Sequence, residues 1–182
     1  MTRIGHLLAL SLLLNFAIPT QSNAENMARP APEWQISQWF NSKGFKLSEL
    51  KGKVVVIDFF QLWCPGCNSF SVPLMHHWEQ KYAEQASGDK IQFVSIHTVF
   101  EGHDYQNPAR LKKYLKEKKI EHPVGVDQLE KGKYIPLTMR KFKTRGTPEM
   151  AIIDKQGRIR FQQFGSFDTK AAERLIDNLL AE

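Results

Sequence analysis

The sequence predicts an α/β protein in which a mixed central sheet lies between two layers of helices. Short apolar runs rich in strand-forming residues alternate along the chain with segments of helical periodicity. Strands separated by helices imply parallel pairing through right-handed crossovers. The last two strands are separated only by a tight turn over residues 155–157, which implies an antiparallel edge to the sheet.

Each element has its own signal. The run 54–60 is continuously β-branched and aromatic, which is typical of a strand buried on both faces. Pro73 should kink the helix in which it lies, Asn107 is a suitable helix start, and Asp168 can cap the last helix. We expect strands at residues 54–60, 91–98, 122–127, 149–154 and 158–165, and helices at residues 68–86, 108–119, 135–142 and after residue 168.

The composition is that of an ordinary globular protein. Hydrophobic residues make up 42% of the chain, and twelve Phe and four Trp are enough for a core that needs no disulfide staples. The net charge is +6, but the densest basic stretch, residues 110–119, carries apolar residues at helical spacing. We therefore interpret its lysines as the solvent face of a helix and expect no nucleic-acid partner.

Residues 1–24 have the layout of a secretory signal peptide. Arg3 gives a positive start, residues 7–18 are mostly apolar, Pro19 ends any helix, and small residues lead to Ala24. The apolar run is shorter than the roughly 20 residues needed to cross a bilayer, so cleavage is favoured over an uncleaved anchor.

Cleavage would leave two parts. Residues 25–45 are expected to form an N-terminal tail and packing segment, and residues 46–182 the main domain. We expect the mature protein to be periplasmic or secreted, with no stable membrane span.

The only two cysteines, Cys64 and Cys67, flank Pro65 and Gly66 directly after the first buried strand and before helix 68–86. A disulfide across so short a loop would add little chain-entropy stabilisation, which disfavours an inert staple. A closed zinc site needs four ligands, and the chain has a single Cys pair, so no metal is expected. The spacing, between a strand and a helix, is typical of a redox-active pair.

The two cysteines should differ in reactivity. The thiolate is the reactive form, and a helix N-terminus stabilises that anion. Cys64 falls at this place and is expected to be an exposed nucleophile, whereas Cys67, one turn later, should be buried. A client would then form a mixed disulfide with Cys64, which Cys67 attacks to release it. This chemistry requires no cofactor.

Two blocks of sequence carry a family resemblance. "VVVIDFFQLWCPGC", residues 54–67, resembles the active-site strand and turn of thioredoxin-fold proteins, and "RGTPEMAIIDKQGRIRFQQFG", residues 145–165, resembles the block that opens their third strand. The chain is most similar to secreted thiol–disulfide oxidoreductases of the TlpA/ResA type, in the redoxin or AhpC-TSA-like superfamily, from about Leu47 to the C-terminus. This resemblance implies a thioredoxin-like fold with a strand–helix insert.

The resemblance also implies roles for the matched residues. Cys64 would be the attacking thiol and Cys67 the resolving one, together forming the redox disulfide. Pro148 would be a cis-proline beside them, with Thr147 offering backbone groups to an extended substrate. The implied substrate-binding residues are Trp63, which would shield the sulfur, Pro65, Gly66, Thr147 and Pro148.

Asp58 lies six residues before Cys64, inside an otherwise apolar strand. In thioredoxin, an aspartate at that offset is buried behind the cysteines and relays a proton to the resolving thiol. A buried carboxyl has a raised pKa and can act as a general base near neutrality; the alternative is a partly hydrated structural residue. The lysine that thioredoxin places beside it has no counterpart here, where the neighbouring strand offers Ser95 and His97, so proton transfer is expected to differ.

The leading functional prediction is an extracytoplasmic thiol–disulfide oxidoreductase that acts on the thiols of other proteins, and the family resemblance favours a disulfide reductase. Its expected partners are client proteins with thiols or disulfides, and a membrane or soluble redox partner that recycles the pair. Two rivals share the fold. A peroxiredoxin-like peroxidase usually has Thr three or four residues before the attacking Cys, where this chain has Gln61 and Phe60. A copper-binding chaperone usually spaces the cysteines one residue wider and adds a His, for which His97, His103 and His122 are candidates.

Overall fold

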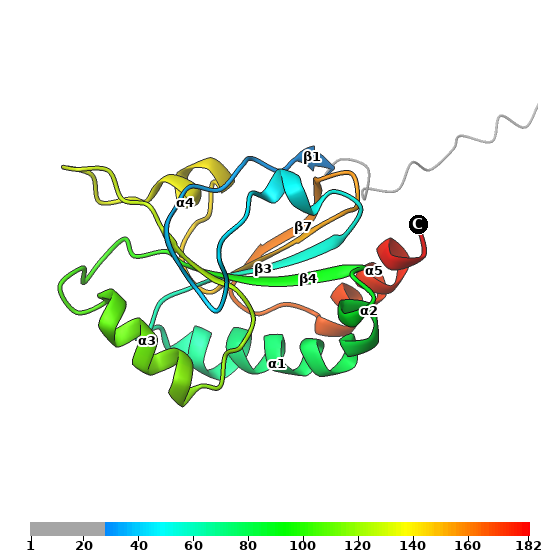
Figure 1. The fold of residues 1–182 in the computed structure, drawn as a ribbon, viewed down its shortest axis with the longest axis horizontal. Helices are drawn as coiled ribbons and strands as arrows, with labels where there is room; N and C mark the ends of the chain where they lie inside the picture. Colours follow the sequence, from blue (N-terminus) through cyan, green and yellow to red (C-terminus); the bar gives the residue numbers. More distant parts are fainter. Residues whose placement is uncertain (1–27) are drawn as a thin grey trace, which may run out of the picture.

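A seven-stranded sheet forms the centre of the molecule, and helices cover both of its faces (Figure 1). The computed structural model describes residues 28–182. The expected signal peptide, residues 1–24, and the first part of the expected packing segment, residues 25–45, lie outside the described residues. Within residues 28–182, no helix combines the length and the apolar character that crossing a bilayer requires.

The elements follow the predicted order, and the five strands and three later helices begin and end within two residues of the predicted positions. The strands are β1 (Arg29–Pro30), β2 (Ile36–Phe40), β3 (Val54–Phe60), β4 (Ile91–His97), β5 (Val124–Asp127), β6 (Glu149–Ile153) and β7 (Arg158–Phe164). The helices are the 3₁₀-helix η2 (Leu47–Leu50), the π-helix η3 (Cys67–Ser71), α1 (Val72–Lys81), α2 (Ala83–Ser87), α3 (Pro108–Glu117), α4 (Leu137–Phe142) and α5 (Thr169–Ala181).

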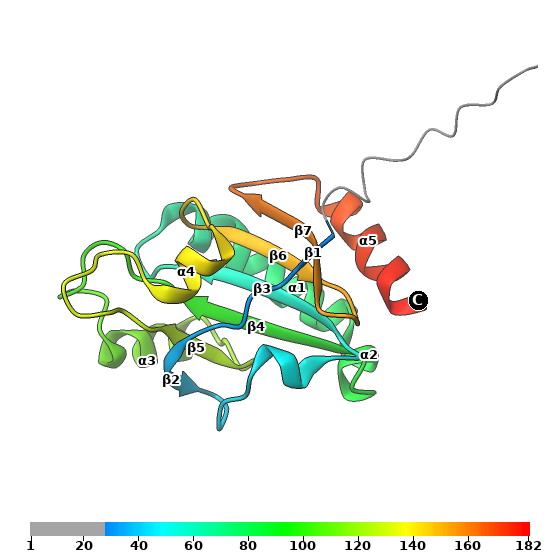
Figure 2. The ribbon, with the colours of Figure 1, turned by 90° about the horizontal axis from the view of Figure 1, so that it is seen from above.

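The sheet is mixed, with the strand order β1-β7-β6-β3-β4-β5-β2 (Figure 2). β3, β4 and β5 pair in parallel, whereas β6 runs antiparallel to β3, and β7 antiparallel to β6. The predicted parallel strands and antiparallel hairpin are therefore confirmed. Both edges are formed by short strands from the N-terminal segment, because β1 pairs with β7 and β2 pairs with β5.

The helix predicted over residues 68–86 is not continuous. It begins as the π-helix η3, continues as α1 and is interrupted at Tyr82, whose backbone (φ −105°, ψ 22°) is not helical. Pro73 lies inside a run of helical backbone over residues 65–81, directly after a turn of π-helix in which the Val72 N–H bonds to the Cys67 carbonyl. The backbone irregularity expected at Pro73 therefore takes the form of a π-helical turn before it, and the break at Tyr82 was not predicted.

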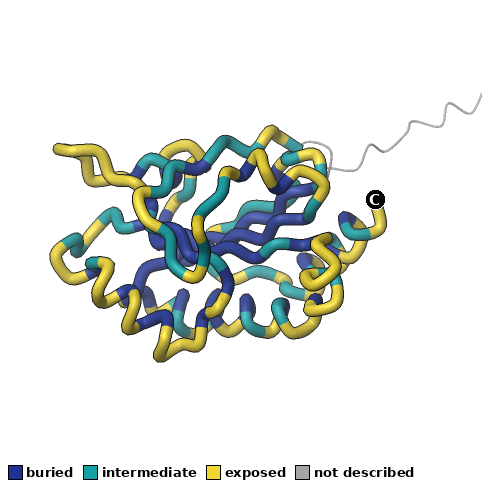
Figure 3. Tube along the Cα trace, viewed as in Figure 1, coloured by how far each residue is buried: buried dark blue, intermediate teal, exposed yellow. Residues whose placement is uncertain are grey.

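The central strand β3 separates two parts of the hydrophobic core, one on each face of the sheet. Burial is deepest along the central strands of the sheet (Figure 3). Val54 and Val56 pack against Trp78 of α1 and against α5. Val55 and Ile57 face the opposite layer, which is built from α4, η2 and the N-terminal segment. All residues of β3 are buried, as predicted. A polar side chain on such a strand is costly unless it is satisfied or used, which singles out Asp58.

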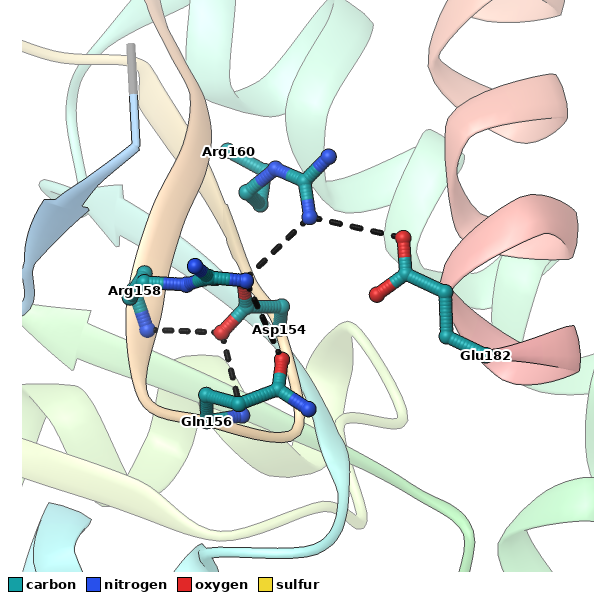
Figure 4. A network of polar contacts seen from close by, with 5 residues as sticks. All are labelled: Asp154, Gln156, Arg158, Arg160 and Glu182. Carbon is teal, nitrogen blue, oxygen red and sulfur yellow. Dashed lines mark hydrogen bonds and ion pairs between the residues drawn. The ribbon is translucent and has the colours of Figure 1, made fainter. Parts of the chain in front are cut away.

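The β6–β7 turn is held by the carboxylate of Asp154 (Figure 4). It accepts hydrogen bonds from the backbone N–H groups of Gln156 (3.0 Å) and Arg158 (2.8 Å). The guanidinium groups of Arg158 (2.8 Å) and Arg160 (3.3 Å) complete the network, and Arg160 also reaches Glu182 at 3.4 Å. Burial alone would raise the pKa of Asp154, but these donors and charges outweigh it and hold the pKa below its usual value.

Asp154→Asn should lower the free energy of unfolding by about 2 kcal/mol at neutral pH, because it removes charge-assisted hydrogen bonds. A carboxylate whose pKa is lowered by folding stabilises above its unfolded pKa, and this stabilisation is lost as the pH falls through its folded pKa. The difference between wild type and variant in urea unfolding should therefore shrink below about pH 4. Asp89→Asn is the control, because the Asp89 side chain is 77% exposed and its ion pair with Lys53 should contribute little. Equal losses in both variants would contradict the role given to Asp154.

Candidate functional site

The end of β3 and the start of the following helix place Cys64 at a helix N-terminus. The chain turns after Phe60, and the Cys64 carbonyl accepts the backbone N–H of Asn68 at 3.1 Å. The Cys64 sulfur accepts the backbone N–H of Cys67, also at 3.1 Å. The Asn68 side chain ties the turn down by donating to the carbonyls of Leu62 and Cys64, both at 3.0 Å. The sulfur therefore occupies the capping position, where an anion is stabilised.

Cys64 has a lowered pKa, of about 6. The largest cause is the hydrogen bond from the Cys67 thiol, which outweighs the opposing effect of burial. The N–H groups of Cys67 and Gly66 and the hydroxyl of Thr147 lower the pKa further. Cys64 is 8% exposed, so the expectation of an exposed nucleophile needs correction. Its sulfur lies at the base of a cleft, because the helix start and the loop before β6 enclose it.

Cys67 is fully buried and has a raised pKa. Its thiol donates to the Cys64 sulfur, and this bond, burial and the charge of Asp58 all favour the protonated form. The two thiols therefore differ as sharply as the sequence predicts, with one thiolate and one thiol near neutral pH. Such a pair has a nucleophile and a second thiol that becomes reactive only after losing a proton.

Asp58 is 0% exposed, and burial raises its pKa to about 7. The Ser71 hydroxyl, which lies near the carboxylate without a hydrogen bond to it, opposes this rise, and the negative charge of Cys64 adds to it. Among residues 28–182, neither carboxylate oxygen of Asp58 has a hydrogen-bond partner. The alternative of a partly hydrated aspartate at the strand end therefore does not describe this side chain. A buried, unpaired carboxyl that titrates near neutrality can accept and return a proton.

The loop before β6 brings Thr147 and Pro148 against the cysteines. The Thr147–Pro148 peptide bond is cis. Pro148 lies so close to Gly66 that a Cβ atom at Gly66 would be 2.9 Å from Pro148 Cδ, which explains the glycine between the cysteines. The Thr147 hydroxyl lies near enough to the Cys64 sulfur to lower the pKa of that thiol. The structure thus brings together residues that are about 80 positions apart in the chain.

A cleft of about 620 Å³ opens beside the Cys64 sulfur. Trp63, which is 45% exposed, forms one wall and stacks on Tyr105 with ring centroids 5.7 Å apart. Arg110 lies over the Tyr105 ring, with its guanidinium carbon 3.9 Å from the ring centroid. The cleft is lined by Gln61, Trp63, Cys64, Pro65, Phe100, Glu101, Arg145, Gly146, Thr147 and Phe164. Trp63 therefore forms a wall beside the Cys64 sulfur, in a cleft whose border carries aromatic and charged side chains.

Two buried amides, which the sequence analysis missed, fasten the cysteine turn to the loop after β4. Gln61 donates to the carbonyl of Thr98 at 3.1 Å and accepts from the Trp63 indole at 2.8 Å. Gln106 donates to Gln61 at 3.1 Å and accepts the backbone N–H of Leu62 at 2.9 Å. The only sequence signal for this contact is the position of Gln61 at the end of an apolar strand. The sequence gives no indication that Gln106 contacts it.

Glu149, which follows Pro148, lies beneath the cis-proline loop and does not line the cleft. It is 2% exposed and is absent from the cleft lining. Its carboxylate accepts the backbone N–H of Arg145 at 2.8 Å and the side-chain amide of Gln162. Arg29 of β1 donates to Gln162 at 2.6 Å, so the N-terminal segment helps to hold this loop.

The histidines considered for copper lie in separate settings. The His97 ring packs on Phe60, and burial lowers the pKa of His97 to about 4. His122 has both ring nitrogens engaged, by Ser95 and Glu79. Within residues 28–182, no group of three or more His, Cys, Asp or Glu side chains is placed to hold a metal ion.

A family model described as Redoxin matches residues 30–180 of the chain. Two solved structures resemble the whole fold. A thioredoxin-like superfamily protein is 42% identical, with a TM-score of 0.79, over 84% of this chain and 97% of that one. A thiol-disulfide isomerase from Corynebacterium glutamicum is 38% identical, with a TM-score of 0.76, over 87% and 99% of the two chains. The predicted thioredoxin-like fold is therefore confirmed.

Other relatives resemble the chain at lower sequence identity. The protein DipZ of Mycobacterium tuberculosis is 29% identical over 80% of this chain, which spans only 20% of the length of DipZ. The thiol-disulfide oxidoreductase ResA of Bacillus cereus is 24% identical over 73% of this chain and 66% of its own length. The resemblance to proteins of the ResA type is thus confirmed.

The lowered pKa of Cys64 predicts selective alkylation of the reduced protein. Iodoacetamide should modify Cys64 with a rate that rises through a midpoint near pH 6, whereas Cys67 should stay unmodified in the folded state. Thr147→Val should raise the midpoint, because it removes a hydroxyl that stabilises the thiolate. Mass spectrometry of timed samples measures both rates. A midpoint near the free-thiol value of about 8.5 would contradict the stabilised thiolate.

Proposed function

The chain belongs to the redoxin family, and we propose that it is an extracytoplasmic thiol–disulfide oxidoreductase that exchanges disulfides with client proteins through Cys64 and Cys67. The observation that carries this proposal is the inequality of the two thiols. Cys64 is a stabilised thiolate at the base of a cleft, and Cys67 is a buried thiol in contact with it. Relatives named thiol-disulfide oxidoreductase and thiol-disulfide isomerase support the same chemistry.

The first step is attack on the client. The Cys64 thiolate attacks one sulfur of a client disulfide, which forms a mixed disulfide and expels the other client sulfur as a thiolate. Thr147 and the N–H groups of Gly66 and Cys67 hold the Cys64 sulfur in place for this attack. Trp63 lines the cleft and Pro148 packs against Gly66 between the two cysteines, and these residues would hold the client chain beside the sulfur.

The second step releases the client. Cys67 passes its proton to Asp58 and attacks the Cys64 sulfur, so that the Cys64–Cys67 disulfide forms and the client leaves as a thiolate. Two electrons have then moved from this protein to the client. The high pKa of Cys67 makes a base necessary, and the pKa of Asp58, at about 7, suits it to accept a proton near neutral pH.

We propose that electrons flow from this protein to its clients. A thiolate that is stabilised less strongly leaves the dithiol more reducing. The pKa of about 6 for Cys64 lies nearer to the thioredoxin value of about 7 than to the DsbA value of about 3.5. A membrane or soluble redox partner would then return the oxidised pair to the dithiol form.

The proposed location follows from the N-terminal sequence. Residues 1–24 are proposed as a cleaved signal peptide that delivers the mature chain to the periplasm or exterior. Residues 46–182 are proposed as the domain that carries the activity, with residues 25–45 packed on it. Trp34 supports this packing, because it is buried among the sheet residues and donates to the carbonyl of Phe45 at 2.8 Å.

The two rival functions have less support. Phe60 lies in the core, and the Gln61 amide is bonded to the Thr98 carbonyl, so neither supplies the peroxide-binding hydroxyl that a peroxidase would need there. A copper site would need His122 to give up its bonds with Ser95 and Glu79. Peroxide-consumption and copper-titration measurements on the purified protein distinguish both rivals from the proposed function.

Substitution of each cysteine tests the proposed steps. Cys64→Ser should abolish reduction of a disulfide-bonded client, because no thiolate remains in the cleft. Cys67→Ser should accumulate a mixed disulfide with the client, visible on non-reducing gels and lost on reduction. Equilibration of the wild type with glutathione should give a potential closer to that of thioredoxin, about −270 mV, than to that of DsbA, about −120 mV. A Cys67→Ser protein that turns over normally would contradict the resolving role.

Asp58 gives a prediction for stability as well as rate. Folding raises its pKa to about 7, so between the unfolded value of about 4 and pH 7 the folded state holds a proton that the unfolded state releases. The stability of the reduced wild type should therefore fall as the pH rises through this window. Asp58→Asn cannot ionise and should be more stable than wild type at pH 8, by on the order of 3 kcal/mol, although it resolves mixed disulfides more slowly. Urea unfolding measures the difference, and parallel pH profiles for the two proteins would contradict a buried, titrating Asp58.

A further inference from the structure

Three polar side chains form a hydrogen-bonded chain on the face of the sheet that α1 and α3 cover. The proposed mechanism uses none of the three. The Ser95 hydroxyl lies 2.7 Å from His122 Nε2, and His122 Nδ1 lies 2.8 Å from Glu79 Oε1. Ser95 is 2% exposed and His122 is 8% exposed. Burying polar groups costs free energy, so a buried network of this kind points to a functional role.

The inner end of the chain lies beside Asp58. In the parallel ladder between β3 and β4, Asp58 and Ser95 are direct partners. The partners two residues earlier, Val56 and Phe93, pack in one cluster with α1, so Asp58 and Ser95 point to this same side of the sheet. Both carboxylate oxygens of Asp58 are buried and have no hydrogen-bond partner among residues 28–182, so Asp58 is the ladder neighbour of Ser95 and becomes a donor to it only when protonated.

The outer end of the chain reaches solvent. Glu79 lies on α1, its side chain is 26% exposed, and it lines a surface cavity of about 620 Å³. Figure 1 shows α1 and α3 side by side on this face of the sheet, and His122 follows α3 in the chain. A proton that arrives at Glu79 can therefore exchange with water.

Each hydrogen that is donated within this chain of side chains points away from Asp58 and towards the surface. A carboxylate only accepts hydrogen bonds, so the His122 Nδ1 that faces Glu79 carries the hydrogen. Nε2 is then the acceptor, and the Ser95 hydroxyl donates to it. The Ser95 oxygen keeps a lone pair free to accept from a protonated neighbour. The order of donors therefore runs from Asp58 towards the surface.

We propose that Ser95, His122 and Glu79 form the route by which Asp58 exchanges its proton with solvent, in place of an ammonium group on the neighbouring strand. The proposal rests on the proposed function. After Asp58 takes the proton of Cys67, it passes a proton to Ser95 as the Ser95 hydroxyl proton moves to His122 Nε2. The Nδ1 proton of His122 moves to Glu79 and then to water, so that one proton leaves and Asp58 is again a carboxylate.

The groups that face His122 come from the two elements packed against it. From α1 it faces Glu79, with His76 3.5 Å from the same carboxylate, and from β4 it faces Ser95. The surface cavity next to Glu79 also has Lys118, Lys119 and Glu121 on its border. The order Ser–His–Glu also occurs in hydrolases, but a hydroxyl that is 2% exposed is closed to any substrate.

His97, the other candidate on this strand, does not belong to the route. Its ring lies 5.3 Å from the Phe60 ring, and Nε2 is 3.4 Å from the Gln106 side chain. The structure therefore shows which of the two residues predicted on the strand next to Asp58 lies directly beside it. Ser95 is the strand neighbour of Asp58, and His97 belongs to the cluster that holds the cysteine turn.

The test uses the reduced full-length protein and 5,5′-dithiobis(2-nitrobenzoate) as the disulfide. Attack by Cys64 releases one coloured thiolate, and attack by Cys67 on the mixed disulfide releases the second, so stopped flow separates the two steps. His122→Gln and Ser95→Ala should slow the second release by about tenfold near neutral pH and leave the first within about twofold of wild type. The slowing should be largest in mild acid, where Asp58 starts protonated and must first lose its proton.

Control variants separate a proton route from a structural role. His76→Gln removes the other imidazole next to Glu79 and should leave both releases unchanged. His122→Ala should regain the fast second release when imidazole is added, and an equal concentration of a non-titrating cosolute should have no effect. The relay is overturned if the second release stays within about twofold of wild type in both His122→Gln and Ser95→Ala, or if both releases slow equally. Failure of the proposed function is a different result, in which the wild type itself gives no second release.

Discussion

Three acidic groups, Cys64, Cys67 and Asp58, share a site with little access to water, and mutual repulsion limits how many of them can be ionised at once. In a poorly solvated site, like charges a few ångströms apart repel strongly. The hydrogen bond from Cys67 gives the first charge to Cys64, while Asp58 and Cys67 each raise the cost of a second one. The order of the chemistry follows from this constraint, because Cys67 can ionise only once Cys64 has given its charge to a disulfide.

The surrounding structure keeps the three groups at fixed separations. β3 carries Asp58 and ends at the turn that carries both sulfurs, and Gly66 lets the cis-proline loop approach that turn closely. Gln61 and Gln106 fix the turn to the loop after β4. Glu149 fixes the opposite loop by accepting the Arg145 N–H. Each anchor lies within or beneath a wall of the cleft, which leaves the cleft itself free to vary with the client.

Much of this arrangement could be predicted from local sequence. Continuous β-branched runs identify the buried strands, and the Cys64–Cys67 spacing between a strand and a helix identifies the site. The interruption at Tyr82 could not be predicted, because helical periodicity continues through it. Nor could the chain from Ser95 to Glu79, since its members lie 27 and 43 residues apart and meet only through the sheet and helix packing. Local patterns thus fix the elements, whereas the polar contacts between them depend on tertiary structure.

The polar chain also bears on why the pKa of Asp58 stays near neutrality. A lysine beside this carboxyl would bring a full positive charge and lower its pKa, whereas a hydroxyl bonded to an imidazole brings no permanent charge. With a pKa of about 7, Asp58 populates both its base and acid forms at neutral pH. It can therefore take a proton from Cys67 in one half of the cycle and return it in the other, which thiol–disulfide exchange in either direction requires. Ser95 in place of a lysine thus keeps the base adjustable rather than permanently ionised.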